Sequence, residues 1–348
     1  MDSAFRQIAA ALSLLMLCIA SPAVSARTAD QAPPGEEVRF ASDPGTMLAG
    51  TLETPRGFGA GPFPVAVIVS GTGPWVRGGW VHIRARLLAS GIATFMYDKR
   101  GLGASTGEFE DTIPAMERDV AAAAAFLRTR RDIDPRRIAL MGISQGAVAA
   151  PLVASRDPGI AAVVMLSGPV GPRGELFLGI LRANLASGGK SPADIAHASA
   201  AVGAWMEARS RGAAASEVAP LRQAAVSAFA AMGLGAGALD VLDNPVVLSM
   251  YEVAPDRALR AVRAPVLAIY GSRDDIIAPE LSYAAAVAAL ADNPDALIVA
   301  VPGMTHELTR AAPLPPGQAA PEDGTMPVVT DTVGAWLARR LGTAPPDR

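Results

Sequence analysis

Strand-like apolar runs alternate with helix-like segments along most of this chain, and this alternation constrains the fold more than any other feature. The strand-like runs occupy residues 64–70, 93–98, 137–142, 160–168, 264–271 and 296–303. Helix-like segments lie between or after them, at about 82–90, 116–130, 145–155 and 328–341. Continuous β-branched runs such as PVAVIVS are typical of strands buried on both faces. The pattern predicts an α/β fold, with a mostly parallel sheet flanked by helices and an N-terminal hairpin.

Residues 171–253 interrupt this alternation. The segment is rich in alanine and favours helix, and it contains no convincing strand. Because the alternation resumes afterwards, we expect a helical cap at 171–253, inserted into a core formed by 37–170 and 254–348. Within the cap, a role in the helical core is the preferred interpretation of Phe177, Trp205 and Met206, and contact with a substrate is the alternative. The Pro-rich stretch 311–327 predicts a surface loop, because a helix follows it.

The N-terminus has the pattern of a targeting segment. An apolar run at 8–20 follows Arg6, and small side chains stand at Val24 and Ala26. The run is shorter than the ~20 residues that span a bilayer. Residues 1–26 are therefore interpreted as a signal peptide cut after Ala26, and 27–36 as a flexible lead-in. We expect a periplasmic or secreted protein without stable membrane insertion; an uncleaved anchor or a buried first helix is the alternative.

Composition narrows the classes of function. The 348 residues include 30 Lys and Arg against 33 Asp and Glu, a net charge of −3, and no basic run. Nucleic acid is therefore not an expected partner. Three histidines and the single Cys18 leave little material for a metal site, and neither a cysteine pair nor an HExxH motif is present. The glycines Gly101 and Gly103 are misplaced for a dinucleotide loop, so no cofactor is expected. Oligomeric state stays open.

Two serines stand in a Gly-x-Ser-x-Gly pattern, Ser105 and Ser144. A nucleophile on a strand-to-helix elbow needs a strand running directly into the serine and a helix starting directly after it. Ser144 has RIALMG before it and QGAVAAPLVAS behind it, whereas the polar, Gly-rich DKRGLGA separates Ser105 from its strand. We therefore interpret Ser144 as the nucleophile and Ser105 as a structural serine in a loop.

A serine nucleophile requires a base, and the base requires an orienting carboxylate. In a sheet of this kind the chain order is serine, acid, histidine. His306 follows the last strand-like run, at the sheet edge where ligands bind, and is the predicted base. His197 falls in the cap, where a solvated or packed role is expected. The loop after 264–271 offers two acids, Asp274 and Asp275.

The oxyanion hole requires backbone donors from two loops. One is predicted at Gln145, where the helix after the nucleophile begins; the second is expected in the loop after 64–70, at Thr72 first and Gly71 second. An ordinary Gly-rich connection is the alternative for this loop. Three neighbouring side chains are candidates for lining an acyl pocket, although core packing is at least as good an interpretation for the tryptophans: Trp75, Trp80 and His82.

Together these residues resemble the α/β-hydrolase superfamily, and more narrowly the bacterial serine hydrolases grouped with the S33 serine aminopeptidases and related esterases. The matching segments are VIVSGTGPW, TFMYDKRGLGASTG, IALMGISQGAVAAPL, APVLAIYGSRDDIIAP and PGMTH. The resemblance implies an eight-stranded sheet with a variable lid, and a triad of Ser144, Asp274 and His306 without cofactor or metal. It favours Asp274 over Asp275, because the family's acid follows the strand-end glycine by three. The chain departs from the family at Ser70, where the family usually has histidine.

The expected function is that of an exported serine hydrolase acting on small or medium acyl esters. An S33-type exopeptidase is the first alternative, and it would require an acidic cluster in the cap to bind the free amine of a peptide. The acids of that segment are scattered along the sequence. A non-catalytic binding protein on the same fold is the second alternative, although such proteins often lose a member of the triad.

Overall fold

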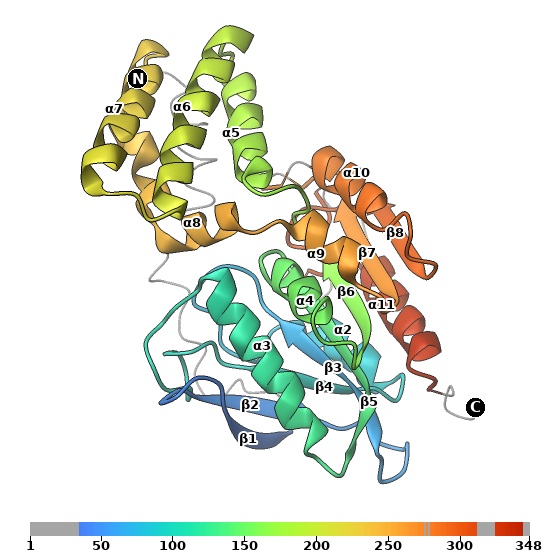
Figure 1. Ribbon diagram of the computed structural model, residues 1–348. Helices are drawn as coiled ribbons and strands as arrows, with labels where there is room; N and C mark the ends of the chain where they lie inside the picture. Colours follow the sequence, from blue (N-terminus) through green and yellow to red (C-terminus); the bar gives the residue numbers. More distant parts are fainter. Residues whose placement is uncertain (1–34, 275, 278, 312–323, 344–348) are drawn as a thin grey trace. The chain divides into compact units, whose positions relative to one another are not determined.

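The computed structural model describes residues 35–274, 276–277, 279–311 and 324–343. These residues form an eight-stranded sheet in the order β1-β2-β4-β3-β5-β6-β7-β8 (Figure 1). The pairs β1–β2 and β2–β4 are antiparallel, and all the others are parallel. The expected fold class is therefore confirmed. The strands are β1 Glu36–Ala41, β2 Met47–Glu53, β3 Phe63–Val69, β4 Ala93–Tyr97, β5 Ile133–Ile143, β6 Ile160–Leu166, β7 Val266–Gly271 and β8 Ala296–Val301.

Helices cover both faces of the sheet. They are α2 Val81–Leu88, α3 Ile113–Arg128, α4 Gly146–Ala154, α9 Pro255–Ala261, α10 Pro279–Ala289 and α11 Pro327–Arg340. Side chains from α3, α4, α9 and α10 share one hydrophobic cluster with the sheet, and those from α2 and α11 share another. The parallel strands are thus buried on both faces, as their continuous apolar runs predict.

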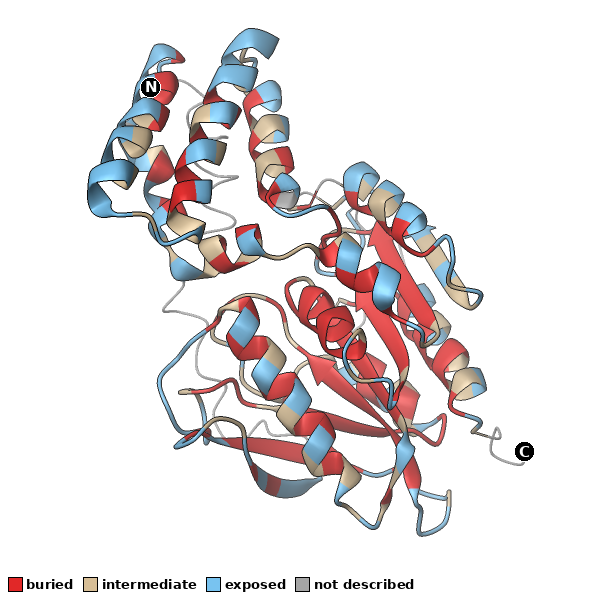
Figure 2. Ribbon diagram, in the orientation of Figure 1, coloured by how far each residue is buried: buried red, intermediate tan, exposed pale blue. Residues whose placement is uncertain are grey.

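Strand β3 illustrates how the alternation of side chains supplies both clusters. Val65 and Val67 belong to the cluster that includes α3 and α4, whereas Ala66 and Ile68 belong to the cluster that includes α2 and α11. Every residue of β3 and of α4 is buried (Figure 2). This burial holds the carboxyl end of β3 and the start of α4 rigidly, and the candidate site is built at these positions.

The chain divides into two compact units, and Gly171–Ala254 forms the helical one. Its helices are α5 Glu175–Ser187, α6 Pro192–Ser210, α7 Ala215–Ala231, the 3₁₀ helix η2 Ala236–Asp243 and α8 Pro245–Glu252. They enclose a hydrophobic cluster of their own, in which Trp205 and Phe229 are fully buried. Phe177 and Met206 lie in the same cluster, as the core interpretation of these side chains expects.

Several element boundaries differ by a few residues from those expected, and three of the starts are instructive. Strand β1 begins at Glu36, inside the expected lead-in. Helix α3 begins at Ile113 instead of 116, because Thr112 caps it: Thr112 Oγ1 accepts a hydrogen bond from the Ala115 N–H at 3.4 Å. Strand β5 begins at Ile133 instead of 137, because Ile133 pairs with Phe63 across an irregularity in the register. The predicted signal peptide (1–26) and residues 27–34 lie outside the described residues.

Candidate active site

The candidate nucleophile stands on a sharp turn between β5 and α4. Ser144 adopts a left-handed backbone conformation with φ of 54°, which is uncommon outside glycine. Its N–H donates to the carbonyl of Leu166, the last residue of β6, at 2.9 Å, and its carbonyl accepts from the Ala147 N–H at 2.9 Å. This strained turn, held at both ends, is the elbow geometry that the sequence around Ser144 predicts.

The two glycines of the motif are required by close backbone contacts. A methyl group at Gly142 would lie 2.1 Å from the carbonyl oxygen of Gly146, and one at Gly146 would lie 2.3 Å from the carbonyl oxygen of Val69. Backbone atoms this close leave no room for a side chain. The elbow can therefore form only where small residues flank Ser144 on both sides, which is the physical basis of the motif.

Ser144, His306 and Asp274 form a continuous hydrogen-bonded series. His306 Nε2 lies 2.9 Å from Ser144 Oγ, and His306 Nδ1 lies 2.9 Å from Asp274 Oδ2. The side chains of His306 and Asp274 are 8% and 2% exposed. The carboxylate bonded to Nδ1 places the ring proton there, and this leaves Nε2 to accept the serine proton.

Two loops at the carboxyl edge of the sheet hold the histidine and the acid. Asp274 follows β7, and its second oxygen accepts the N–H groups of Ile276 and Ile277 at 3.0 and 2.8 Å. His306 follows β8, and the Arg273 N–H donates to the Met304 carbonyl at 2.9 Å, which joins the two loops. Asp275, the alternative acid, lies outside the described residues.

The loop after β3 lies directly against the nucleophile. A methyl group at Gly71 would be 3.1 Å from Ser144 Cβ and 3.6 Å from Ser144 Oγ. The structure thus brings the predicted oxyanion loop, containing Gly71 and Thr72, to the serine. Gln145 lies at the start of α4 and is 1% exposed. Its side-chain amide donates to the carbonyl of Asp111 at 2.7 Å.

The aromatic residues proposed from the sequence have different environments. Trp75 is 41% exposed, and its indole N–H donates to the Thr72 carbonyl at 2.8 Å, so it contacts the oxyanion loop. Trp80 packs against the cluster beneath α2 and precedes that helix, which favours a packing role. His82 lies half-buried in the first turn of α2.

Ser105 has a structural environment. Its hydroxyl donates to the Asp98 carbonyl at 2.7 Å and accepts from the Ala49 N–H at 2.9 Å. It therefore ties the loop after β4 to β2. His197 is exposed on α6 in the helical unit. Neither residue belongs to the series that contains Ser144.

Lys99 and Asp111 are the site residues that sequence reasoning missed. They form a buried ion pair behind the oxyanion loop. The visible signal was a lysine directly after a buried strand, in TFMYDKRG, but its partner lies on another loop and cannot be read from spacing. Asp98, in the same segment, contacts Arg77 at 3.3 Å.

No group of three or more His, Cys, Asp or Glu side chains suited to a metal ion occurs among the residues that the structure describes. Among those same residues, no helix is long and apolar enough to cross a membrane.

The fold and this site geometry define the class of α/β-hydrolases. The chain belongs to the family described as serine aminopeptidase, S33, whose model matches residues 63–311. This match confirms the resemblance drawn from the sequence motifs. Family membership establishes an α/β-hydrolase, and the bond that this chain cleaves is a separate question.

Proteins and solved structures similar to this chain include several kinds of hydrolase. A thiohydrolase of Arthrinium phaeospermum is 35% identical over 131 residues, covering 37% of this chain and 41% of the relative. The chain thus spans less than half the length of the curated relatives that it matches. A Pyrococcus furiosus esterase has a TM-score of 0.52 at 15% identity, covering 88% of this chain and 89% of that one. A Mycobacterium smegmatis proline iminopeptidase has a TM-score of 0.51 at 20% identity, covering 88% and 99%. At these identities the solved structures show the fold alone.

Proposed function

We propose that this chain is an exported serine hydrolase that cleaves carboxylic esters of small or medium acyl groups. The observation that carries the proposal is the hydrogen-bonded series from Ser144 through His306 to Asp274, with both contacts at 2.9 Å. The series stands on an elbow that holds the hydroxyl at the carboxyl edge of the sheet. A hydroxyl so placed can be deprotonated as it attacks a carbonyl carbon.

The chemistry proceeds through an acyl-enzyme. Ser144 Oγ attacks the ester carbonyl while neutral His306 accepts the serine proton at Nε2, and Asp274 stabilises the resulting imidazolium through Nδ1–H. The C–O bond to the alcohol then breaks, and His306 gives its proton to the leaving oxygen. In the second half, His306 accepts a proton from water as water attacks the acyl carbon, and Ser144 is released with its proton restored.

Negative charge develops on the carbonyl oxygen in both halves. The backbone N–H of Gln145 and that of Thr72 are the proposed donors, with Gly71 as the second choice in the loop after β3. The approach of Gly71 to Ser144 Oγ supports placing this loop at the developing oxyanion. Losing one such donor costs about 3 kcal/mol of transition-state stabilisation.

Several observations support an exported acyl hydrolase. The matching family model and the curated relative named a thiohydrolase support a hydrolase. The apolar run at 8–20, followed by the small Val24 and Ala26, supports export. We propose small or medium acyl groups, because nothing in the sequence resembles a long lipid-binding surface.

Charge pairing in the helical unit weighs against the exopeptidase alternative. A free peptide amine would need an unneutralised acidic cluster. Instead, several carboxylates of this unit are paired with arginines: Glu207 with Arg173, Glu217 with Arg211, and Asp240 and Asp243 with Arg222. The ester reading is therefore the stronger one.

The proposal is tested with p-nitrophenyl acetate, butyrate and octanoate, and with proline p-nitroanilide, using residues 27–348. We expect faster hydrolysis of the acetate and butyrate than of the octanoate, and no anilide cleavage. Ser144→Ala should lower kcat by about 10⁴-fold or more. Cleavage of the anilide alone would favour the exopeptidase. Absence of hydrolysis on every substrate would favour the binding protein and contradict the proposal.

A further inference from the structure

Two buried charged side chains lie beside the candidate site without a role in the proton transfers. Lys99 follows β4 and Asp111 precedes α3, and their side chains are 8% and 3% exposed. Their ammonium and carboxylate groups form an ion pair. A buried ion pair is a poor source of net stability, because removing both charges from water offsets their attraction. Net stability therefore does not explain why this ion pair lies beside the candidate site.

Lys99 and Asp111 contact both segments that carry the proposed oxyanion donors. Lys99 Nζ donates to the Gly71 carbonyl at 2.5 Å, and Asp111 Oδ2 accepts from the Gly73 N–H at 2.6 Å. The backbone carbonyl of Asp111 accepts the side-chain amide of Gln145 at 2.7 Å. The ion pair thus holds the loop after β3, and the backbone of Asp111 joins it to the start of α4.

The contact with Gly71 determines where the Thr72 N–H points. The Gly71 carbonyl and the Thr72 N–H belong to the same planar peptide group, and in a trans peptide they point in opposite directions. Holding the carbonyl toward Lys99 therefore fixes the N–H on the opposite side. A cation on the carbonyl also polarises the amide, which strengthens its N–H as a donor.

The contact with Gly73 distinguishes between neighbouring donors. Its N–H is taken by the Asp111 carboxylate, so it is unavailable to a substrate. Thr72 then remains the donor that the ion pair orients without occupying. This hydrogen bond excludes Gly73 as the donor and leaves Thr72, with Gly71 as the second choice.

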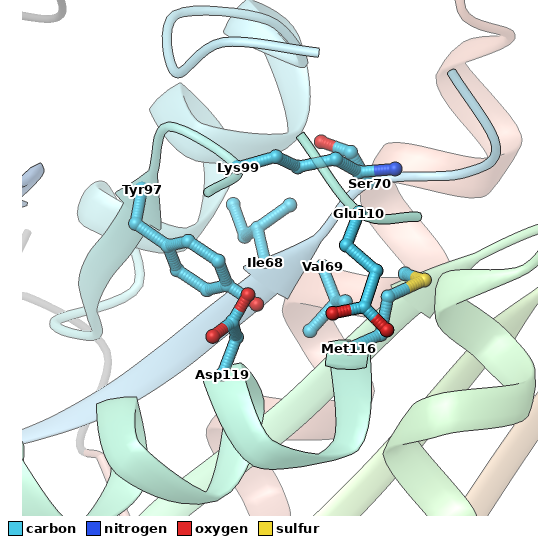
Figure 3. A pocket seen from close by; sticks show the side chains of 8 residues that line it. All are labelled: Ile68, Val69, Ser70, Tyr97, Lys99, Glu110, Met116 and Asp119. Atoms are coloured by element: carbon cyan, nitrogen blue, oxygen red, sulfur yellow. The ribbon is translucent and has the colours of Figure 1, made fainter. Parts of the chain in front are cut away.

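The cavity that the Lys99 side chain lines is too small for an acyl chain. Its side chain lines a cavity of about 10 Å³ together with Ser70, Tyr97 and Asp119 (Figure 3). That volume holds about one water molecule. Burial lowers the pKa of Lys99, against the attraction of Asp111 and Asp119, and burial raises the pKa of Asp111 against the attraction of Lys99. Lys99 is therefore placed to act on the backbone and not directly on a substrate.

We propose that Lys99 is a positioning residue of the oxyanion hole and acts through the Gly71–Thr72 peptide. Asp111 holds both Lys99 and the N–H of Gly73. This inference rests on the proposed function. A positioning role of this kind lowers the rate of the chemical step and leaves substrate binding nearly unchanged, because the donor strengthens its contact as charge develops.

The test compares two double variants that each remove a buried ion pair. Lys99→Met with Asp111→Asn removes both charges, and asparagine can still accept the Gly73 N–H, so no buried charge is left unpaired. The control is Arg84→Met with Glu53→Gln, a pair of similar burial, 7% and 5% exposed, that contacts the carbonyls of Gly78 and Gly79 instead. Lys99→Met alone serves as a third protein.

The readouts are kcat and KM for p-nitrophenyl butyrate, the inhibition constant of a trifluoromethyl ketone, and the Tm. The ketone forms a tetrahedral oxyanion on Ser144 and so reports on the hole directly. For the Lys99 and Asp111 double variant we expect kcat to fall about 30-fold or more, KM to change less than threefold, and ketone binding to weaken with kcat. The control should keep kcat within about threefold at a similar loss of Tm.

Two failures are distinguishable. An active wild type, with a Lys99 and Asp111 double variant that keeps kcat and ketone affinity within threefold, would overturn the positioning role alone. Equal losses of activity in both double variants would also overturn it, by assigning the effect to stability. A wild type that neither hydrolyses esters nor binds the ketone would overturn the proposed function, and this inference with it.

Discussion

At Gly71 the absence of a side chain directly affects the geometry of the candidate nucleophile. Its backbone approaches the nucleophile so closely that an added methyl group would lie 3.1 Å from Ser144 Cβ. Contacts this short force the neighbour to shift by a few tenths of an ångström. A shift of the hydroxyl relative to His306 and the oxyanion loop degrades the alignment on which attack depends.

Gly71→Ala should therefore lower kcat/KM for p-nitrophenyl butyrate by about tenfold while the protein stays folded. Gly79→Ala is the matched control, because a methyl group there has no neighbour within 4 Å. Steady-state kinetics and the Tm of both variants make the comparison. Equal activity in the two variants would show that the loop after β3 does not crowd the nucleophile.

The site residues differ in whether they could be predicted from the sequence. Ser144 and His306 could be proposed because each lies in the turn or loop after a strand, and the carboxyl ends of parallel strands meet at one edge. The loop after β7 offered both Asp274 and Asp275, and only the family resemblance favoured Asp274. Lys99 and Asp111 could not, because their partners are backbone groups on loops that only the folded chain brings together. Their catalytic or positioning roles stay predictions until variants are measured.

At the scale of elements, the periodicity of apolar residues located the parallel strands and most helices. The predicted boundaries were wrong where pairing with a distant strand extends an element beyond its local sequence pattern. Strand β5 starts at Ile133, although Asp134 and Pro135 disfavour a strand, because Ile133 pairs with Phe63 beyond a register irregularity. Local propensity contains no information about such a partner.

Elements at the antiparallel end of the sheet are joined by a charged network. Asp43, in the β1–β2 turn, accepts hydrogen bonds from Arg100 at 2.8 Å and from Arg118 at 2.9 Å. Arg100 also contacts Asp119 on α3. The hydrogen bond from Arg100 lowers the pKa of Asp43 from 3.8, with further lowering by Arg118 and against a smaller opposing effect of burial.

The lowered pKa of Asp43 determines how its contribution to the free energy of unfolding depends on pH. The folded chain holds the Asp43 proton less tightly than the unfolded chain does, so its stabilisation is complete above the unfolded pKa and is lost as pH falls through the folded one. Asp43→Asn should lower the free energy of unfolding at pH 7 by less than about 1 kcal/mol. The difference from wild type should shrink between pH 5 and 3 in urea titrations. A difference that stays constant over this range would contradict the assignment.

At the scale of the whole molecule, the fold gathers residues that are far apart in sequence. The elbow after β5, the loop after β7 and the loop after β8 all emerge at the carboxyl edge of one sheet, which is how Ser144 and His306 come within 2.9 Å. The class of fold followed from alternation and motifs. The helical unit, with its own buried cluster around Trp205, carries no motif that identifies a substrate.

The most direct test of the account is covalent labelling of residues 27–348 with a fluorophosphonate, followed by peptide mass spectrometry. The account predicts one phosphonylated residue, Ser144, and no labelling in Ser144→Ala. Ser105→Ala, the other Gly-x-Ser-x-Gly serine, should still be labelled at Ser144. Labelling at Ser105, or no labelling of the folded wild type at all, would contradict the assignment of Ser144 as the nucleophile.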